Sequence, residues 1–291
     1  MKNILITGAG SYIGTSVEKW LLHWPEKYKV TVLDMISEKW REFDFNGYDV
    51  VYHVAGIAHK TNVSDELYER VNHQLAVEVA VMSIKAYVKQ FIFMSSGAVY
   101  TQSDKKHPEI IVNENTNCEP ITAYGISKMW AEEDIKKVVI DHNSLMKITI
   151  LRPPTVYGPG AKGNYNPLAK MAVSTPIIPK IQNKRSMIYI DNLCEFIHLC
   201  IDEEAEGVFL PQNREYVCTS DMMREISVAH RHKLLLVPGL TWAVRLASRM
   251  TDVVNKVFGT YIYCPLDGEY FGGRYQVVDF KNSIIKSEGL G

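Results

Sequence analysis

The sequence predicts an α/β protein: a Rossmann-type, doubly wound parallel sheet with a smaller mixed α/β lobe at its C-terminal end. Short apolar runs alternate with helical segments through residue 152, and a glycine-rich turn follows the first run. After residue 152, prolines and glycines interrupt this pattern. Strands that are continuously apolar and separated by helices belong to parallel sheets with helices on both faces.

The alternating elements follow in chain order. Apolar runs predict strands at residues 2–7, 29–34, 49–55, 90–95 and 147–152. The segments between them predict helices at residues 11–24, 65–87 and 121–141. Short apolar runs suit buried strands, whereas longer segments with helically spaced apolar residues, such as Val17 and Leu21, suit helices.

A change of composition marks the second lobe. Pro153, Pro154 and the Gly158-Pro159-Gly160 run open a loop-rich passage, and further prolines divide the next segments. Because proline and glycine end regular elements, we predict a Rossmann domain at residues 1–152 and a smaller mixed lobe at residues 153–291. Some segments of the lobe can return to the first domain.

Composition limits the function classes. A chain of 291 residues with 46% hydrophobic and 22% charged residues is long and apolar enough for a sizeable globular core. A net charge of -1 gives no reason to expect a nucleic-acid or membrane partner. The five cysteines form no CxxC pair, no ligand cluster predicts a metal, and no signal peptide or membrane span is expected. We therefore predict a cytoplasmic protein.

The first candidate site is the turn from Gly8 to Gly14, with the sequence GAGSYIG. It directly follows a predicted strand and opens a predicted helix. In that context, glycines let backbone N–H groups approach a pyrophosphate at the helix N-terminus. A simple tight turn is the alternative interpretation.

An acidic residue indicates which dinucleotide would bind. Asp34 ends the second predicted strand, twenty residues beyond Gly14. A carboxylate there can accept both hydroxyls of an adenine ribose and would repel a 2′-phosphate, and the next basic residue is Lys39. NAD is therefore favoured over NADP. Alternatively, Asp34 caps the following turn.

Tyr124 and Lys128 form the candidate catalytic pair. Their i, i+4 spacing places both on one face of a helix. A phenol loses its proton at about pH 10, and a nearby ammonium favours the phenolate, so the pair can act as a general base nearer neutral pH. Such spacing also occurs on solvated helix faces, but the glycine turn and Asp34 favour the functional interpretation.

Six segments together resemble the extended short-chain dehydrogenase/reductases, specifically the nucleotide-sugar epimerase/dehydratase family and its 4-epimerases. They are ITGAGSYIG, DVVYHVAGIAH, FIFMSSGAVY, AYGISK, LRPPTVYGPG and KRSMIYIDN. The correspondence covers most of the chain.

The resemblance implies a role for each matching position. The cofactor-binding positions are Gly8, Gly10, Ser11, Tyr12, Ile13, Gly14, Asp34, Asp44, Ala55, Gly56, Tyr124 and Lys128. Within this set, Asp44 would reach the adenine amine. The implied catalytic residues are Ser96, Tyr124 and Lys128, with Ser95 as a rival to Ser96. The implied substrate-binding residues are Ser96, Thr155, Asn164 and Arg185, although Arg185 also suits a surface charge.

The sequence departs from the family pattern at several positions. Ser11 replaces the middle glycine of the fingerprint, and Thr101 follows Tyr100 where glycine is usual. Gly97 and Ala98 follow Ser96 where dehydratases of the family carry an Asp-Glu pair, so the resemblance argues against 4,6-dehydration. The chain is also shorter than a typical hexose epimerase.

The resemblance implies NAD-dependent epimerisation at C4 of a UDP-hexose or UDP-N-acetylhexosamine through a 4-keto intermediate. An NAD(P)H-dependent 4-ketosugar-nucleotide reductase of surface-polysaccharide biosynthesis is the alternative. A third possibility is a regulator that senses NAD(H) without catalysis. A homodimer is also implied by the resemblance.

Overall fold

The computed structural model of the chain describes residues 1–58, 63–101, 109–113, 115–163, 165–239, 258–264 and 269–290. The chain divides into two compact units. The first unit comprises Met1–Val99, Cys118–Pro153 and Leu193–Pro211. The second unit comprises Tyr100–Asn117, Pro154–Asn192 and Gln212–Gly291.

A six-stranded sheet forms the centre of the first unit, and all its strand pairs are parallel. Its order is β10-β6-β4-β3-β1-β2. The strands are β1 (Lys2–Thr7), β2 (Tyr28–Leu33), β3 (Val50–His53), β4 (Gln90–Met94), β6 (Lys147–Leu151) and β10 (Gly207–Phe209). The predicted Rossmann-type fold is confirmed.

Two differences from the predicted strands have local causes. β3 ends at His53 rather than Ala55, because the amides of Val54 and Ala55 both donate to the carbonyl of Thr7, at 3.1 and 2.9 Å. The three-residue strand β10 was not predicted, since its short sequence carries no clear apolar run. It extends the sheet beside β6.

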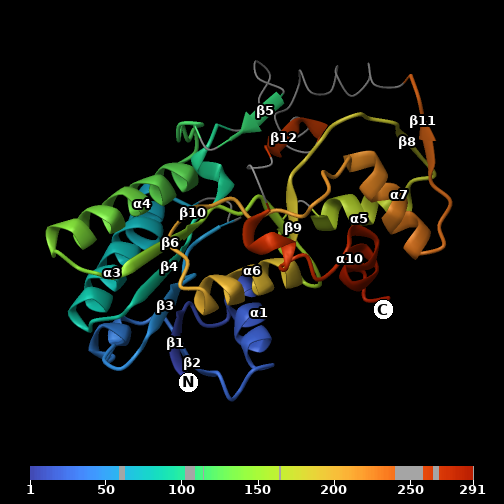
Figure 1. Cartoon of the computed structure of the whole chain (residues 1–291). Helices are drawn as coiled ribbons and strands as arrows, with labels where there is room; N and C mark the ends of the chain where they lie inside the picture. Colours follow the sequence, from blue (N-terminus) through green and yellow to red (C-terminus); the bar gives the residue numbers. More distant parts are fainter. Residues whose placement is uncertain are drawn as a thin grey trace. The chain divides into compact units, whose positions relative to one another are not determined.

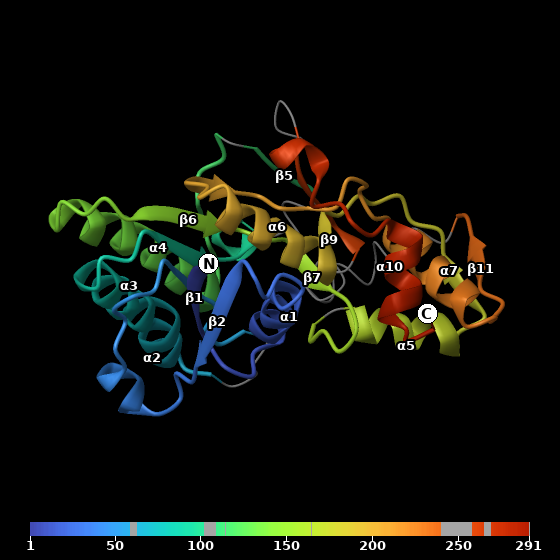
Figure 2. The same ribbon diagram turned by 60° about the horizontal axis from the view of Figure 1, so that its bottom comes forward.

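Helices cover both faces of this sheet (Figures 1 and 2). On one face, α3 (Leu75–Lys85) and α4 (Ala123–Asp141) pack their apolar residues against the strands. The core formed there includes Leu5, Val51, Phe91, Ala80 and Ile135. The other face is covered by α1 (Tyr12–Leu21) and α6 (Ile190–Asp202).

The predicted helix at residues 65–87 is divided. It consists of α2 (Asp65–Tyr68), the π-helical segment η2 (Glu69–Gln74) and α3. A π-helical turn is uncommon and often lies near a functional site. The buried Asn72 lies in this turn.

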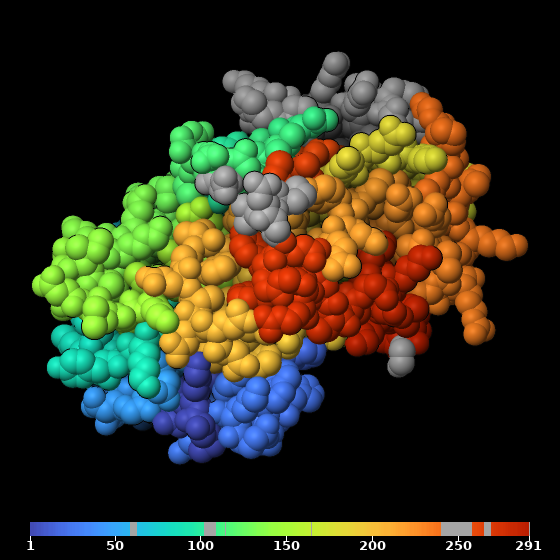
Figure 3. Space-filling model, viewed as in Figure 1, coloured from blue at the N-terminus to red at the C-terminus, as the bar shows by residue number. Residues whose placement is uncertain are grey.

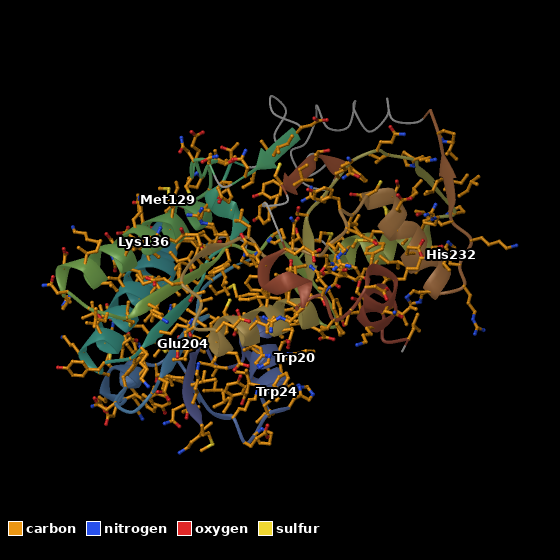
Figure 4. All side chains as sticks on the ribbon, in the orientation of Figure 1. Trp20, Trp24, Met129, Lys136, Glu204 and His232 are labelled. Atoms are coloured by element: carbon orange, nitrogen blue, oxygen red, sulfur yellow. The ribbon has the colours of Figure 1, made fainter. Side chains whose placement is uncertain are left out.

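Aromatic contacts join α6 to the region of α1 within the first unit. The indole Nε1 of Trp20 donates to Glu195 at 2.8 Å, and Trp24 stacks on His198 with ring centroids 4.0 Å apart. Trp20 and Trp24 are labelled in Figure 4. These contacts hold residues 193–211 to the first unit.

The second unit is mixed α/β. Its described residues form three parallel strand pairs: β5 (Glu109–Val112) with β12 (Thr260–Tyr263), β7 (Thr155–Tyr157) with β9 (Met187–Tyr189), and β8 (Ile177–Pro179) with β11 (Leu235–Val237). Its helices include α5 (Tyr165–Ser174), α7 (Thr219–Ala229) and α10 (Phe280–Ser287). Short one-turn helices are η1 (Glu38–Glu42) and η3 (Gly97–Val99) in the first unit and η4 (Tyr270–Gly273) in the second.

This division differs from a single boundary after residue 152. Residues 193–211 lie in the first unit because β10 pairs with β6. Residues 100–117 lie in the second unit because β5 pairs with β12. In the part of the chain that the structure describes, no helix is both long and apolar enough to cross a bilayer.

We expect Gln90→Leu to destabilise the first unit. The buried Gln90 amide donates to the Thr149 hydroxyl and to the carbonyls of Cys200 and Ala205, at 3.0, 2.9 and 3.0 Å. A leucine would remove these three hydrogen bonds, although the Cys200 and Ala205 carbonyls would each keep one donor, the Ala205 amide and the Thr149 hydroxyl. We expect the loss to cost about 1–3 kcal/mol in the free energy of unfolding. Urea denaturation measures this loss, and the exposed Gln74→Leu control should change it by less than about 0.5 kcal/mol.

Candidate active site

The glycine turn lies between β1 and α1 and packs against the end of β3. Gly8 is buried with a φ of 120°, and a Cβ there would lie 2.8 Å from the amide nitrogen of Ala55. A Cβ on Gly14 would lie 2.9 Å from Cγ1 of Val54. Both positions therefore require glycine, because any side chain would separate the turn from β3.

Ser11 has a clear structural role at the position where the family has glycine. Its side chain caps α1 by accepting from the Gly14 amide at 3.2 Å. Gly10 has a φ of 71°, and no atom lies within 4 Å of the place that a Cβ would take there, so the turn is open at this point. The serine at position 11 thus preserves the start of α1.

The place of this turn in the sheet suits a dinucleotide. The strand order reverses between β1 and β3, and ligands of doubly wound sheets bind at the carboxyl ends of the strands at such a reversal. The N-terminus of α1 adds the positive end of a helix dipole, with Tyr12 and Ile13 in its first turn. The backbone around Gly8 and Gly14 therefore fits a pyrophosphate.

Two acidic residues predicted to contact the nucleoside are exposed. Asp34 follows β2, and its Oδ1 accepts from the amide of Ile36 at 2.9 Å, which is the turn-capping role considered from the sequence. Asp44 accepts from the backbone and side chain of Asn46, at 2.9 and 2.7 Å. Their contacts to a ribose and an adenine stay predictions.

The segment after β3 lies against the catalytic helix. A Cβ on Gly56 would lie 3.0 Å from Oδ1 of Asn72 and 3.4 Å from Nζ of Lys128. Asn72 holds Ile57 through both backbone groups, at 2.7 and 3.0 Å, and donates to the Ser127 hydroxyl at 3.3 Å. These contacts give Asn72 a structural role.

Ser96, Tyr124 and Lys128 come together in the first unit. Ser96 follows β4 and is hydrogen-bonded to Tyr124 on α4. Lys128 is buried, donates to the carbonyl of Met94 at 2.8 Å and lies 4.6 Å from the ring centre of Phe93. The structure therefore brings all three predicted catalytic residues to the end of β4.

The two adjacent serines, Ser95 and Ser96, have different contacts. Ser95 is buried and donates to the carboxylate of Glu132. Ser96 is half-buried and bonded to Tyr124. These contacts favour Ser96 as the catalytic hydroxyl. Glu132 was not identified from the sequence, although it continues the Tyr124–Lys128 spacing by four residues.

The direction of one pKa differs from the sequence-based expectation. Burial raises the pKa of Tyr124 above its usual value, and the hydrogen bond with Ser96 opposes this effect only in part. We expected the Lys128 ammonium to lower it. Burial instead lowers the pKa of Lys128 to about 8, and its ammonium is directed at the Met94 carbonyl.

Of the four substrate-binding candidates, Ser96 lies in the first unit, and Thr155 and Arg185 lie in the second. Thr155 begins β7, where it pairs with Met187 of β9, and Arg185 lies two residues before Met187. Asn164 lies outside the described residues. Thr155 thus lies on β7, and Arg185 lies just before β9, the strand that pairs with β7.

Arg185 is a half-buried cation. Its side chain donates to the carbonyl of Gly259 at 3.1 Å, and burial lowers the pKa of the guanidinium. Across the described ranges, no carboxylate forms an ion pair with it. A half-buried guanidinium without a carboxylate partner suits an anionic ligand.

Comparisons with known proteins show the family of this chain. The model of the NAD dependent epimerase/dehydratase family matches residues 4–233. This chain belongs to that family, as the sequence motifs predicted, and it is an enzyme that uses NAD as its cofactor.

Individual relatives are similar over most of the chain. A UDP-glucose 4-epimerase of Vibrio cholerae is 30% identical over 286 residues, which cover 89% of this chain and 86% of the relative. An N-acetyl-alpha-D-glucosaminyl-diphospho-ditrans,octacis-undecaprenol 4-epimerase of Escherichia coli O157:H7 is 30% identical over 222 residues, covering 70% and 65%. The crystal structure of a Thermus thermophilus UDP-glucose 4-epimerase complex with NAD is similar in fold, with a TM-score of 0.72, 18% identity and 99% and 98% coverage.

We expect Gly125→Ala to separate α4 from η3, the short turn that follows Ser96. A Cβ at this position would overlap the carbonyl oxygen of Ala98 and lie 2.9 Å from Cβ of Pro120. The resulting shift should cost about 1–3 kcal/mol in the free energy of unfolding and should weaken the Ser96–Tyr124 contact. Thermal unfolding and the rate of turnover measure both effects. Lys136→Ala, at an exposed position of the same helix (Figure 4), is the control and should leave both near wild type.

Proposed function

We propose that this enzyme interconverts the C4 epimers of a nucleotide sugar, a UDP-hexose or a UDP-N-acetylhexosamine, through a 4-keto intermediate. The observation that carries this proposal is the contact of Ser96 with Tyr124, one helical turn from the buried Lys128. Membership of the epimerase/dehydratase family and the similarity to 4-epimerases favour this reaction.

The proposed cofactor-binding residues lie in the first unit. Gly8, Gly10, Ser11, Tyr12, Ile13 and Gly14 would hold the pyrophosphate, with Asp34 and Asp44 at the adenosine, Ala55 and Gly56 along the cofactor, and Tyr124 and Lys128 at the nicotinamide ribose. When bound, NAD supplies the acceptor and later the donor of the hydride at C4. The remaining chemistry belongs to side chains of this chain.

Tyr124 would take the proton of the sugar 4-hydroxyl and return it after the intermediate has turned. Because burial raises the pKa of this phenol in the protein alone, its basicity depends on positive charge beside it. The Lys128 ammonium and the charge of the oxidised cofactor act in that direction. Ser96 would hold the reacting oxygen by a hydrogen bond.

The second unit would retain the intermediate while its sugar turns. Arg185 would bind the diphosphate, with Thr155 and Asn164 as further contacts to the substrate. Binding energy from a part of the substrate that does not react can hold the ketone in place without lowering its reactivity.

Dehydration fits the site less well than epimerisation. Gly97 and Ala98 form the η3 turn directly after Ser96, and neither side chain can transfer a proton. An elimination at C5 and C6 would need an acid or base at these positions, as dehydratases of the family have.

An assay without added cofactor tests the proposal. The purified protein is incubated with UDP-glucose, UDP-GlcNAc or N-acetylglucosaminyl-diphospho-undecaprenol, and NMR identifies the products. A C4 epimer of either UDP-sugar supports the proposal. Turnover of the lipid-linked sugar alone would assign the substrate class of the Escherichia coli relative. Activity only on a 4-ketosugar with added NAD(P)H would instead show a reductase, and NAD(H) binding without any turnover would show a sensor.

The homodimer and the cytoplasmic location stay predictions. Trp130 and Ile140 on α4 are exposed by 42% and 72%, which gives a dimer an apolar surface. The green atoms of α4 are uncovered in Figure 3.

We expect Tyr124→Phe to bind NAD normally but to turn over about 10²–10⁴-fold more slowly, because the general base is lost. Fluorescence titration with NADH and the epimerisation rate measure the two effects. Tyr87→Phe, at an exposed tyrosine of the first unit, should retain full activity. A Tyr124→Phe rate within a few-fold of wild type would contradict the assignment of the base.

We expect Arg185→Met to raise the KM for a UDP-sugar by about 10–100-fold, the worth of a charge-assisted hydrogen bond, with a smaller effect on kcat. The neighbouring Lys184→Met removes an exposed cation and should change KM by less than about twofold. Initial rates at several substrate concentrations separate the two constants. Equal KM values in both variants would remove Arg185 from the diphosphate site.

A further inference from the structure

Three consecutive residues at the end of β4 contact three residues of α4 that are spaced four apart. The carbonyl of Met94 accepts from Lys128, the hydroxyl of Ser95 donates to Glu132, and Ser96 is hydrogen-bonded to Tyr124. Residues four apart lie on one face of a helix, so these contacts align α4 with the strand end. Glu132 is the member of this row that the proposed mechanism does not use.

Glu132 is held in a buried ion pair. Its side chain is 2% exposed and that of Arg152 is 11% exposed. Nε of Arg152 lies 3.0 and 3.1 Å from the two carboxylate oxygens, and a second guanidinium nitrogen donates to the same carboxylate. Such a bidentate pair has a defined geometry, but both ions lose hydration when they are buried.

Arg152 directly follows β6, the strand next to β4. Ser95 donates its amide to the carbonyl of Leu151 at 2.8 Å, and Gly97 donates to that of Pro153 at 2.9 Å. The strand ends are therefore already joined by backbone hydrogen bonds on both sides of Arg152. A well-packed apolar pair could hold the same elements at a lower desolvation cost, so the charges suggest an electrostatic role.

The groups that face Lys128 support such a role. Burial lowers the pKa of Lys128 to about 8, and the carboxylate of Glu132 opposes this effect. On β3, burial and the Lys128 charge lower the pKa of His53 to about 3, so this imidazole is neutral. Tyr124 on the same helix is also a neutral phenol in the protein alone, since burial raises its pKa. The ring of Tyr68 on α2 lies against it, with ring centroids 6.1 Å apart.

We propose that Glu132 is a positioning residue that keeps Lys128 in its ammonium form and holds the end of β4 against α4. Arg152 fixes the carboxylate for this task. The inference rests on the proposed roles of Tyr124 and Lys128, because the ammonium is needed beside the base. It adds to those roles a residue, Glu132, whose carboxylate stabilises the buried Lys128 ammonium.

The sign of the pH effect follows from this arrangement. Without the carboxylate, burial acts on Lys128 unopposed, and its pKa falls further below about 8. The falling alkaline side of the rate profile then moves to lower pH. A fall of about one unit in the pKa of Lys128 would lower its ammonium fraction about fivefold at pH 8 and almost not at all at pH 6. The rate should fall in the same proportion.

The test compares Glu132→Gln with the double variant Glu132→Gln/Arg152→Met in the full-length protein. The double variant is included because the single one leaves a buried guanidinium unpaired and can fail to fold, whereas loss of both charges is often tolerated. NMR titration of ¹³Cε-labelled lysine, with the Lys128 signal assigned by Lys128→Met, is the first readout. The ratio of turnover at pH 6 to that at pH 8 is the second.

We expect Lys128 to titrate at lower pH in both variants, and the activity ratio to rise with it. Glu132→Asp should return both readouts toward wild type. Asp49→Asn is the matched control, because it breaks an ion pair with Lys89 at 2.8 Å before β3 without touching the site. It should leave the Lys128 titration unchanged.

A Lys128 titration like that of wild type in both variants would overturn the inference. An unfolded double variant would also overturn it, since the pair would then serve folding alone. The NMR titration needs no substrate, so it remains informative if the enzyme fails to epimerise any sugar. Failure of the inference and failure of the proposed function are thus distinguishable.

Discussion

The buried ammonium of Lys128 is the constraint on which the site depends. A lysine removed from water is stable as a cation only if acceptors and negative charge surround it. The chain provides a carbonyl at the end of β4, an aromatic ring beneath it and a carboxylate one helical turn away. The glycine at position 56 leaves room above the ammonium. The close packing of α4, β4 and the segment after β3 can be understood from these requirements.

The same packing explains why the phenol is not basic by itself. Burial that suits a hydride transfer, because it excludes water, also disfavours the phenolate of Tyr124. In the proposed mechanism, the phenolate would form when the positive charges of Lys128 and of the oxidised cofactor both lie beside it. Catalysis would thus be confined to the loaded enzyme, which prevents unproductive proton transfer in the empty one.

Much of the first unit could be predicted because its signals are local. Continuous apolar runs indicated the main strands, and the glycine turn and the Tyr124–Lys128 spacing indicated the site. The features that the sequence did not reveal are a very short strand and a contact between residues far apart in the chain. β10 has three residues, and the partners Glu132 and Arg152 are twenty positions apart and meet only when α4 packs on the sheet. The direction of the Tyr124 pKa depends on burial, which spacing alone does not reveal.

The return of residues 193–211 to the first unit has a consequence for how such an enzyme can be dissected. A fragment ending near residue 153 would lack β10 and α6, so β6 would become an open sheet edge and the side chains beneath α6 would face water. Open edges and bare apolar faces promote aggregation. Neither unit is a contiguous stretch of chain, and recombination between homologues would have to exchange several segments at once to preserve either one.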